Sequence, residues 1–155
     1  MAISWAPTLS WILLVVLFAV LANAWNGHDP GWYAALPRPS YQPPDAVFAV
    51  MWPLGFALLL VVGGAVVRVA PTGVAWSATG VLAGQVALAL GWARLFYVPH
   101  RLGAAAGCLA AAAVLAWVLA VVVGRAEAWG GLALVPYAGW LTVAAALSFS
   151  YARPT

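Results

Sequence analysis

The sequence contains no lysine and only three acidic residues, so charged side chains make up 6% of its 155 residues. A soluble domain carries roughly 25% charged residues, which it needs to cover a surface that faces water. Hydrophobic residues instead account for 66% of this chain. These proportions exclude a soluble globular domain and indicate an integral membrane protein.

Basic residues are too few and too scattered to form a nucleic-acid interface. The net charge of +3 depends on six arginines distributed among loops, with no basic patch. A nucleic-acid partner would require such a patch on one face. We therefore expect membrane lipids, and no nucleic acid, as partners.

Groups suited to catalysis or metal binding are also scarce. The three acids stand near loops, and His28 and His100 lie in different loops without ligand spacing. Cys108, the single cysteine, lies in an alanine-rich apolar run. Neither a nucleophile–base pair nor a metal cluster is visible. We expect no metal and no required cofactor, and these residues favour a binding protein over an enzyme.

Five apolar runs account for nearly the whole chain. Each has about the 20 residues needed to cross roughly 30 Å of hydrocarbon, and they cover residues 8–25, 46–68, 74–96, 102–124 and 129–152. We predict an all-α fold, a bundle of five transmembrane helices that forms a single domain over residues 1–155. Trp5, Trp11 and Trp25 flank the first run, where we expect them in the interfacial aromatic belts.

Two further expectations concern topology. Ala22-Asn23-Ala24 resembles a signal-peptidase site, but no Lys or Arg precedes the first run, so we expect it to be retained as a span. The arginines divide into two sets, four on the side of the first loop and the C-terminus, and two on the other: Arg38, Arg94, Arg101 and Arg153, against Arg68 and Arg125. The positive-inside rule then predicts a cytoplasmic first loop and C-terminus.

The loop over residues 26–45 is rich in proline and aromatic residues. Pro37, Pro39, Pro43 and Pro44 exclude a helix interior here, because proline lacks a backbone donor and fixes φ. Aromatic residues are interleaved with them, whereas a disordered linker would be poor in aromatics. We predict a structured loop that lies over one end of the bundle.

The third run presents two distinct helical faces. Gly80, Gly84, Ala87 and Gly91 form a smooth stripe that suits close helix packing, either within the bundle or between subunits. A second stripe, roughly 140° away, carries Gln85, Ala89, Trp92 and Phe96. Gln85 places an amide deep in this run, where we expect it either to bond to a neighbouring helix or to line a cavity.

Three segments together resemble the tryptophan-rich sensory protein/translocator protein (TspO/MBR) family. The first is W-Y-A-A-L-P-R-P-S-Y-Q-P-P from Trp32, followed by Trp52 and Phe56 on the next helix. The others are G-Q-V-A-L-A-L-G-W-A-R-L-F-Y from Gly84, and Pro136-Tyr137 with Trp140 and Leu147. The chain departs from the family pattern in three places, where Ala89, Arg94 and Ser148 replace the usual Asn, Pro and Asn.

The resemblance implies a membrane receptor or sensor that binds a hydrophobic planar ligand in the bundle. Its ligand would be a tetrapyrrole such as protoporphyrin or haem, or a sterol-like lipid, with a role in trafficking or regulation. Two alternatives stay open: light- or oxygen-dependent porphyrin degradation, and a structural subunit without a ligand. His100 and Arg101 resemble the family's basic turn, which we expect to meet lipid headgroups.

The resemblance also implies a site and an oligomer. The residues expected to bind the ligand are Trp32, Tyr41, Pro43, Pro44, Phe48, Trp52, Phe56, Gln85, Trp92, Phe96, Trp140, Ala144 and Leu147. A homodimer is expected to form through Gly80, Gly84, Ala87 and Gly91. The competing interpretation is that this groove receives the fourth helix of the same chain, at Gly103 and Gly107.

Overall fold

The computed structural model describes residue 3 and residues 5–153, where every regular element is a helix. These elements are α1 (Trp5–Asn26), α2 (Pro30–Ala34), α3 (Asp45–Val62) with its π-helical continuation η1 (Gly63–Val67), α4 (Thr72–Tyr97), α5 (Leu102–Ala126), α6 (Ala128–Ala133) and α7 (Val135–Ala152). Five helical stretches in this part of the chain are long and apolar enough to cross a membrane, the fifth being α6 with α7. The predicted all-α membrane bundle is confirmed.

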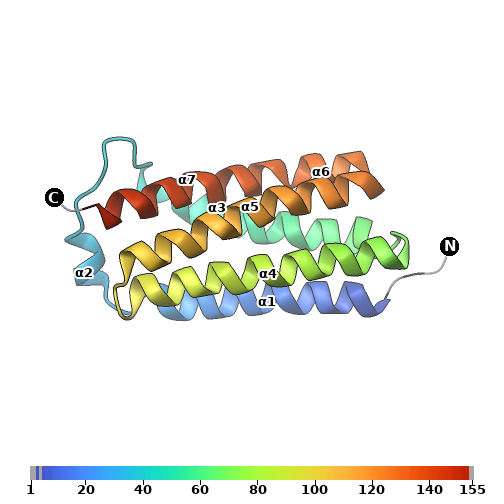
Figure 1. Cartoon of the computed structure of the whole chain (residues 1–155), viewed down its shortest axis with the longest axis horizontal. Helices are drawn as coiled ribbons and strands as arrows, with labels where there is room; N and C mark the ends of the chain where they lie inside the picture. The colour runs from blue at the N-terminus through green and yellow to red at the C-terminus, as the bar shows by residue number, and fades with distance from the viewer. Residues whose placement is uncertain (1–2, 4, 154–155) are drawn as a thin grey trace.

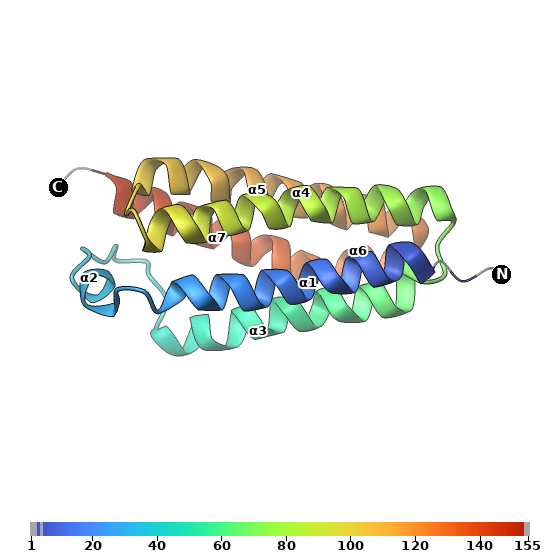
Figure 2. The same cartoon turned by 90° about the horizontal axis from the view of Figure 1, so that it is seen from below.

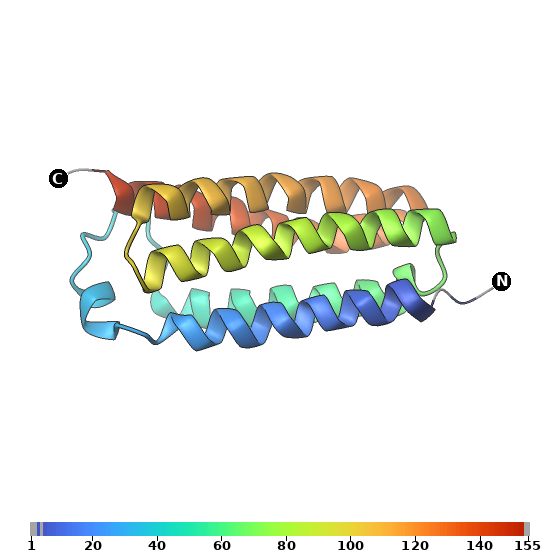
Figure 3. The same ribbon diagram turned by 60° about the horizontal axis from the view of Figure 1, so that its bottom comes forward.

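The spans form a ring whose order differs from their order in the chain. Helix α4 packs along α1 and α5, α5 packs along α7, and α3 closes the ring through sparser contacts with α1 and α7. Figures 2 and 3 show α1 beside α3, and α4 beside α5. Helix α2 and the end of α7 lie at one end of the bundle, and α1 begins at the other (Figure 1).

The outer surface of the bundle is largely aliphatic. Side chains that point outward include Leu9, Leu13, Val20, Val50, Val61, Val114, Val121 and Leu132. In water an apolar surface of this extent would promote aggregation, whereas in hydrocarbon it needs no cover. The chain is therefore an integral, multi-pass membrane protein.

Trp11 overturns one of the sequence expectations. Trp5 is 56% exposed, as an interfacial residue would be, but Trp11 is fully buried between α1 and α3. Its indole Nε1 donates a hydrogen bond to the Leu59 carbonyl oxygen at 2.8 Å. The indole fits because Gly63 has no side chain, and a Cβ there would lie 2.7 Å from Nε1. The expected interfacial Trp11 is instead a contact that holds α1 against α3.

The fifth span is not the single helix expected over residues 129–152. It breaks at Leu134, between α6 and α7, and Pro136 follows in the first turn of α7. Proline has no N–H to continue the α-helical ladder, and its ring would clash with the carbonyl four residues earlier. Gly131 lets α6 approach α5 closely, since a Cβ there would lie 2.7 Å from the Gly124 Cα.

Residues 27–44, here called the lid, connect α1 to α3 across one end of the bundle (Figure 1). The short helix α2 starts there because the Asp29 side chain accepts a hydrogen bond from the Trp32 N–H at 3.1 Å, and Pro30 occupies its first position. The lid ends at Pro44, the N-cap of α3. The predicted structured first loop is confirmed.

Candidate functional site

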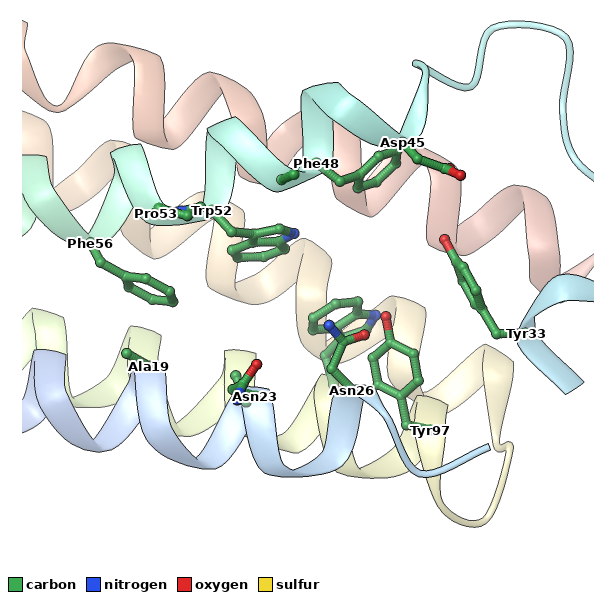
Figure 4. Close-up of a pocket in the computed structure, with 13 residues that line it drawn as sticks. Ala19, Asn23, Asn26, Tyr33, Asp45, Phe48, Trp52, Pro53, Phe56 and Tyr97 are labelled. Atoms are coloured by element: carbon green, nitrogen blue, oxygen red, sulfur yellow. The ribbon is translucent and has the colours of Figure 1, made fainter. Parts of the chain in front are cut away.

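A pocket of about 420 Å³ lies between α1, α3 and α4, next to the lid. Figure 4 shows its side chains, with Trp52 and Phe56 on the side of α3 that faces Ala19 and Asn23 of α1, and Phe48 nearer Asp45. The pocket is lined by Ala19, Ala22, Asn23, Asn26, Tyr33, Asp45, Phe48, Ala49, Trp52, Pro53, Phe56, Trp92 and Tyr97. We call it the large pocket.

Two nearly parallel indoles form the central feature of this site. The rings of Trp52 on α3 and Trp92 on α4 have centroids 5.8 Å apart and an interplanar angle of 16°. Phe56 adds a third ring, tilted by 30° from that of Trp52. Aromatic faces aligned in this way offer a flat ligand extensive stacking contact. The wall is therefore suited to a planar apolar molecule.

A second, much smaller pocket of about 40 Å³ adjoins the first, and we call it the small chamber. Five residues line both: Tyr33, Phe48, Trp52, Trp92 and Tyr97. The small chamber adds Phe96 from α4 and, from α7, Ala144, Leu147, Ser148 and Tyr151. The two spaces thus share a wall of aromatic rings.

The structure brings together seven of the predicted ligand-binding residues in these two pockets. They are Phe48, Trp52, Phe56, Trp92, Phe96, Ala144 and Leu147. Because they come from α3, α4 and α7, the site depends on the packing of three helices. The resemblance in the sequence had implied a single site formed by these side chains.

Trp140 and Gln85 line neither pocket. Trp140 packs edge-on against Phe48 and Trp52, with centroid distances of 5.1 Å and 6.1 Å, so it supports the wall from behind. Gln85 is fully buried, and its Oε1 accepts a hydrogen bond from the Tyr137 hydroxyl at 2.9 Å. Of the two interpretations of Gln85, the structure shows the bond to a neighbouring helix.

Trp32, Tyr41, Pro43 and Pro44 belong to the lid and line neither pocket. Trp32 stacks on His100 with centroids 3.7 Å apart and an interplanar angle of 7°. His100, which has a positive φ of 57° in the α4–α5 turn, therefore meets the lid rather than the lipid headgroups expected from the sequence.

The opposite side of the lid is fastened to α7. The Tyr41 hydroxyl donates to the Ala146 carbonyl oxygen at 3.0 Å and is also hydrogen-bonded to Ser150 Oγ. The Tyr151 hydroxyl donates to the side-chain oxygen of Gln42. These bonds and the Trp32 stack tie the lid to both sides of the bundle end. Of the lid residues, Tyr33 lines both pockets.

Helix α1 contributes polar residues to the large pocket that were not predicted from the sequence. Asn23 and Asn26 line the large pocket together with Ala19 and Ala22. The signal was present, because positions 19, 22, 23 and 26 fall on one helical face at spacings of three and four residues. The missed residues of the two pockets also include Tyr33, Asp45, Tyr97, Ser148 and Tyr151.

Asp45 is the charged residue among those that line the two pockets. Asp45 lines the large pocket and forms an exposed ion pair with Arg38, whose Nη1 lies 3.5 Å from Oδ1. Arginine contributes to the lining of neither pocket. Within the described residues, no three His, Cys, Asp or Glu side chains gather where they could hold a metal ion. The residues that line the pockets can stack on a ligand and form a few hydrogen bonds with it.

The glycine stripe of the third span divides between two environments. A Cβ at Gly84 would meet Leu115 of α5 at 3.3 Å, and one at Gly91 would meet Cys108 at 3.6 Å. Gly80 and Ala87 are exposed on the outside of the bundle. Gly103 and Gly107 have nothing within 4 Å of an added Cβ, so they do not complement the stripe within the chain.

Comparison with known proteins gives a consistent result. The sequence model of the TspO/MBR family matches residues 10–153. Protein CrtK of Rhodobacter capsulatus is 35% identical over 136 aligned residues, which cover 81% of this chain and 79% of that protein. The translocator protein of Bos taurus is 29% identical over 165, covering 96% and 90%. Tryptophan-rich protein TspO of Chlorobaculum tepidum is 31% identical over 129, covering 77% and 76%.

Proposed function

This chain belongs to the TspO/MBR family, and we propose that it binds a hydrophobic planar ligand at the large pocket of its helix bundle. The observation that carries the proposal is the pair of nearly parallel indoles, Trp52 and Trp92, in the pocket wall. A membrane concentrates apolar molecules around such a pocket, and stacking on the indoles supplies the orientation.

The ligand class that we propose is a tetrapyrrole such as protoporphyrin or haem, or a sterol-like lipid. The volume of about 420 Å³ lies within the range of roughly 300–1,000 Å³ that is typical of small-molecule sites. The lining is mostly aromatic and aliphatic, with amides and tyrosines at intervals. Binding would serve the trafficking or regulation of the ligand.

A titration with protoporphyrin tests this proposal. The protein in nanodiscs should show saturable quenching of tryptophan fluorescence, because Trp52 and Trp92 would stack on the porphyrin. Nanodiscs without protein, mixed with free tryptophan, correct for absorption by the porphyrin. Quenching that rises linearly, without saturation, would argue against a site and in favour of a structural subunit.

We further propose that the lid and the C-terminus face the cytoplasm. Arg38 lies in the lid, Arg101 lies in the α4–α5 turn and Arg153 follows α7, all at one end of the bundle, and Arg68 and Arg125 lie toward the other. Positive charge near span ends favours the cytoplasmic side. Single cysteines at Ser40 and Thr72, introduced into a Cys108→Ala background, should be labelled from opposite sides of intact cells. Labelling of the Ser40 position from outside would reverse the assignment.

The outward part of the glycine stripe supports a homodimer. Gly80 and Ala87 present no side chain larger than a methyl on the surface of α4. A membrane helix gains little by hydrophobicity from leaving lipid, so its association depends on close backbone packing, which such a surface allows. We propose that a second copy of the chain packs here.

A double variant, Gly80→Leu with Ala87→Leu, should convert the dimer into a folded monomer that still binds ligand. These two positions are chosen because Gly84 and Gly91 contact α5 of the same chain, where added bulk would disturb the fold itself. Gly139→Leu is the matched control, since nothing lies within 4 Å of a Cβ at Gly139. Molecular mass in nanodiscs provides the measurement, and a double variant that stays dimeric would exclude this surface.

A further inference from the structure

Ser148 is an unusual hydroxyl in this bundle. It is 2% exposed, lies within α7 and lines the small chamber, yet its Oγ has no hydrogen-bond partner among the described residues. A serine inside a helix can bond to the carbonyl four residues earlier. Ser150 does so, donating to the Ala146 carbonyl at 3.1 Å, and Thr142 donates to Ala138 at 2.9 Å. The Ser148 hydroxyl can therefore bond to a group that enters the small chamber.

A second unpartnered polar atom belongs to the same lining. The Nε1 of Trp92 is buried and makes no hydrogen bond to any described residue. A buried donor without an acceptor is costly, and the cost is higher in a membrane where water cannot serve. Indole can only donate, whereas a serine hydroxyl can donate or accept. The Ser148 hydroxyl and the Trp92 indole N–H can therefore both donate a hydrogen bond to an acceptor atom of a ligand.

The dimensions of the small chamber restrict what can enter it. Its volume of about 40 Å³ is about a tenth of the 420 Å³ of the large pocket. The large pocket therefore suits the body of a ligand, and the small chamber beyond the shared wall suits one oxygen-bearing substituent.

Charge decides which kind of oxygen suits the chamber. The residues that line it include no arginine, lysine or histidine. A carboxylate there would lose its hydration without gaining a counter-ion, which strongly disfavours burial. An uncharged acceptor, such as an ester, amide or ketone carbonyl or a hydroxyl, requires no counter-ion.

We propose that the small chamber is a subsite for one uncharged oxygen atom of the ligand, held by the Ser148 hydroxyl and the Trp92 indole N–H. The proposal rests on ligand binding at the large pocket and adds a specificity to it. The protein should bind a planar apolar ligand with a neutral oxygen substituent more tightly than a planar ligand that carries only alkyl substituents. Ser148 is then a specificity-determining residue.

Two porphyrins that differ in this respect provide the test. Protoporphyrin dimethyl ester carries neutral ester oxygens, and etioporphyrin carries alkyl groups only. The unsubstituted protein should bind the ester more tightly, and Ser148→Ala should weaken ester binding about three- to tenfold, the usual effect of losing one hydrogen bond. Its affinity for etioporphyrin should be unchanged. Ser77→Ala is the control, because Ser77 Oγ bonds to the Gly73 carbonyl on the exposed face of α4.

The outcomes separate this proposal from the proposed function. Equal affinity of Ser148→Ala and the unsubstituted protein for the ester overturns the subsite and leaves ligand binding intact. An equal loss for both porphyrins assigns Ser148 to packing and also overturns the subsite. If the unsubstituted protein binds neither porphyrin saturably, then the proposed function itself fails for tetrapyrroles.

Discussion

A Trp52→Ala variant should bind protoporphyrin about 30-fold more weakly than the unsubstituted chain, a loss of about 2 kcal/mol. Trp52 lines both pockets, stacks against Trp92 and contacts Trp140 edge-on at 6.1 Å. Its removal deletes one stacking face and also leaves Trp92 without its neighbour. The loss should therefore exceed that of any single aromatic residue outside the pockets.

The other tryptophans provide a graded comparison. Trp92→Ala should weaken binding to a similar extent, because Trp92 forms the second indole face of the pair. Trp140→Ala should have a smaller effect, since Trp140 supports the wall from behind. Trp117→Ala should leave affinity unchanged, because that indole is 41% exposed on α5 and donates to Thr142 Oγ1 at 2.9 Å.

Affinities come from the porphyrin titration in nanodiscs, with size-exclusion profiles to establish that each variant is folded. Trp52→Phe distinguishes the loss of the aromatic face from the loss of side-chain volume. It keeps an aromatic face and loses part of the contact area. If Trp52→Ala and Trp92→Ala both bind as tightly as the unsubstituted chain, these residues serve packing and the ligand lies elsewhere.

The second large effect concerns stability. Gly63→Leu should lower the free energy of unfolding by about 3 kcal/mol, from overpacking and the loss of one buried hydrogen bond. A side chain at Gly63 would occupy the space of the Trp11 indole, which must then release the Leu59 carbonyl oxygen. Since α3 has only sparse contacts with α1, among them the edge-on packing of Phe18 against Phe56, the loss falls on a small interface.

The adjacent glycine is a control for this prediction. A Cβ at Gly64 would have nothing within 4 Å, so Gly64→Leu should be neutral or slightly stabilising, since leucine favours a helix more than glycine does. The two variants are compared by their thermal unfolding in detergent. Unfolding is measured as the loss of the monodisperse peak in size-exclusion chromatography. Equal midpoints for the two variants would show that the Trp11 contact contributes little.

The sequence alone was sufficient for the spans and the lid, and it pointed to several residues that line the two pockets. A chain with 66% hydrophobic residues and runs of about 20 can satisfy its backbone in hydrocarbon only as helices, so their number follows from counting. Proline determined where the first loop lay. Trp52, Trp92 and Phe96 were identified by their matched positions in a family pattern.

The neighbours of each helix were decided only by the tertiary structure. Composition could not show that α1 lies against α4, which brings Asn23 and Asn26 to the pocket, or that Trp11 fits over Gly63. Nor could it show that Gln85 faces Tyr137. The physical reason is that lipid is as apolar as leucine, so hydrophobicity indicates which segments enter the membrane but not which helix faces meet. Those faces are selected by shape and by hydrogen bonds between residues far apart in the sequence.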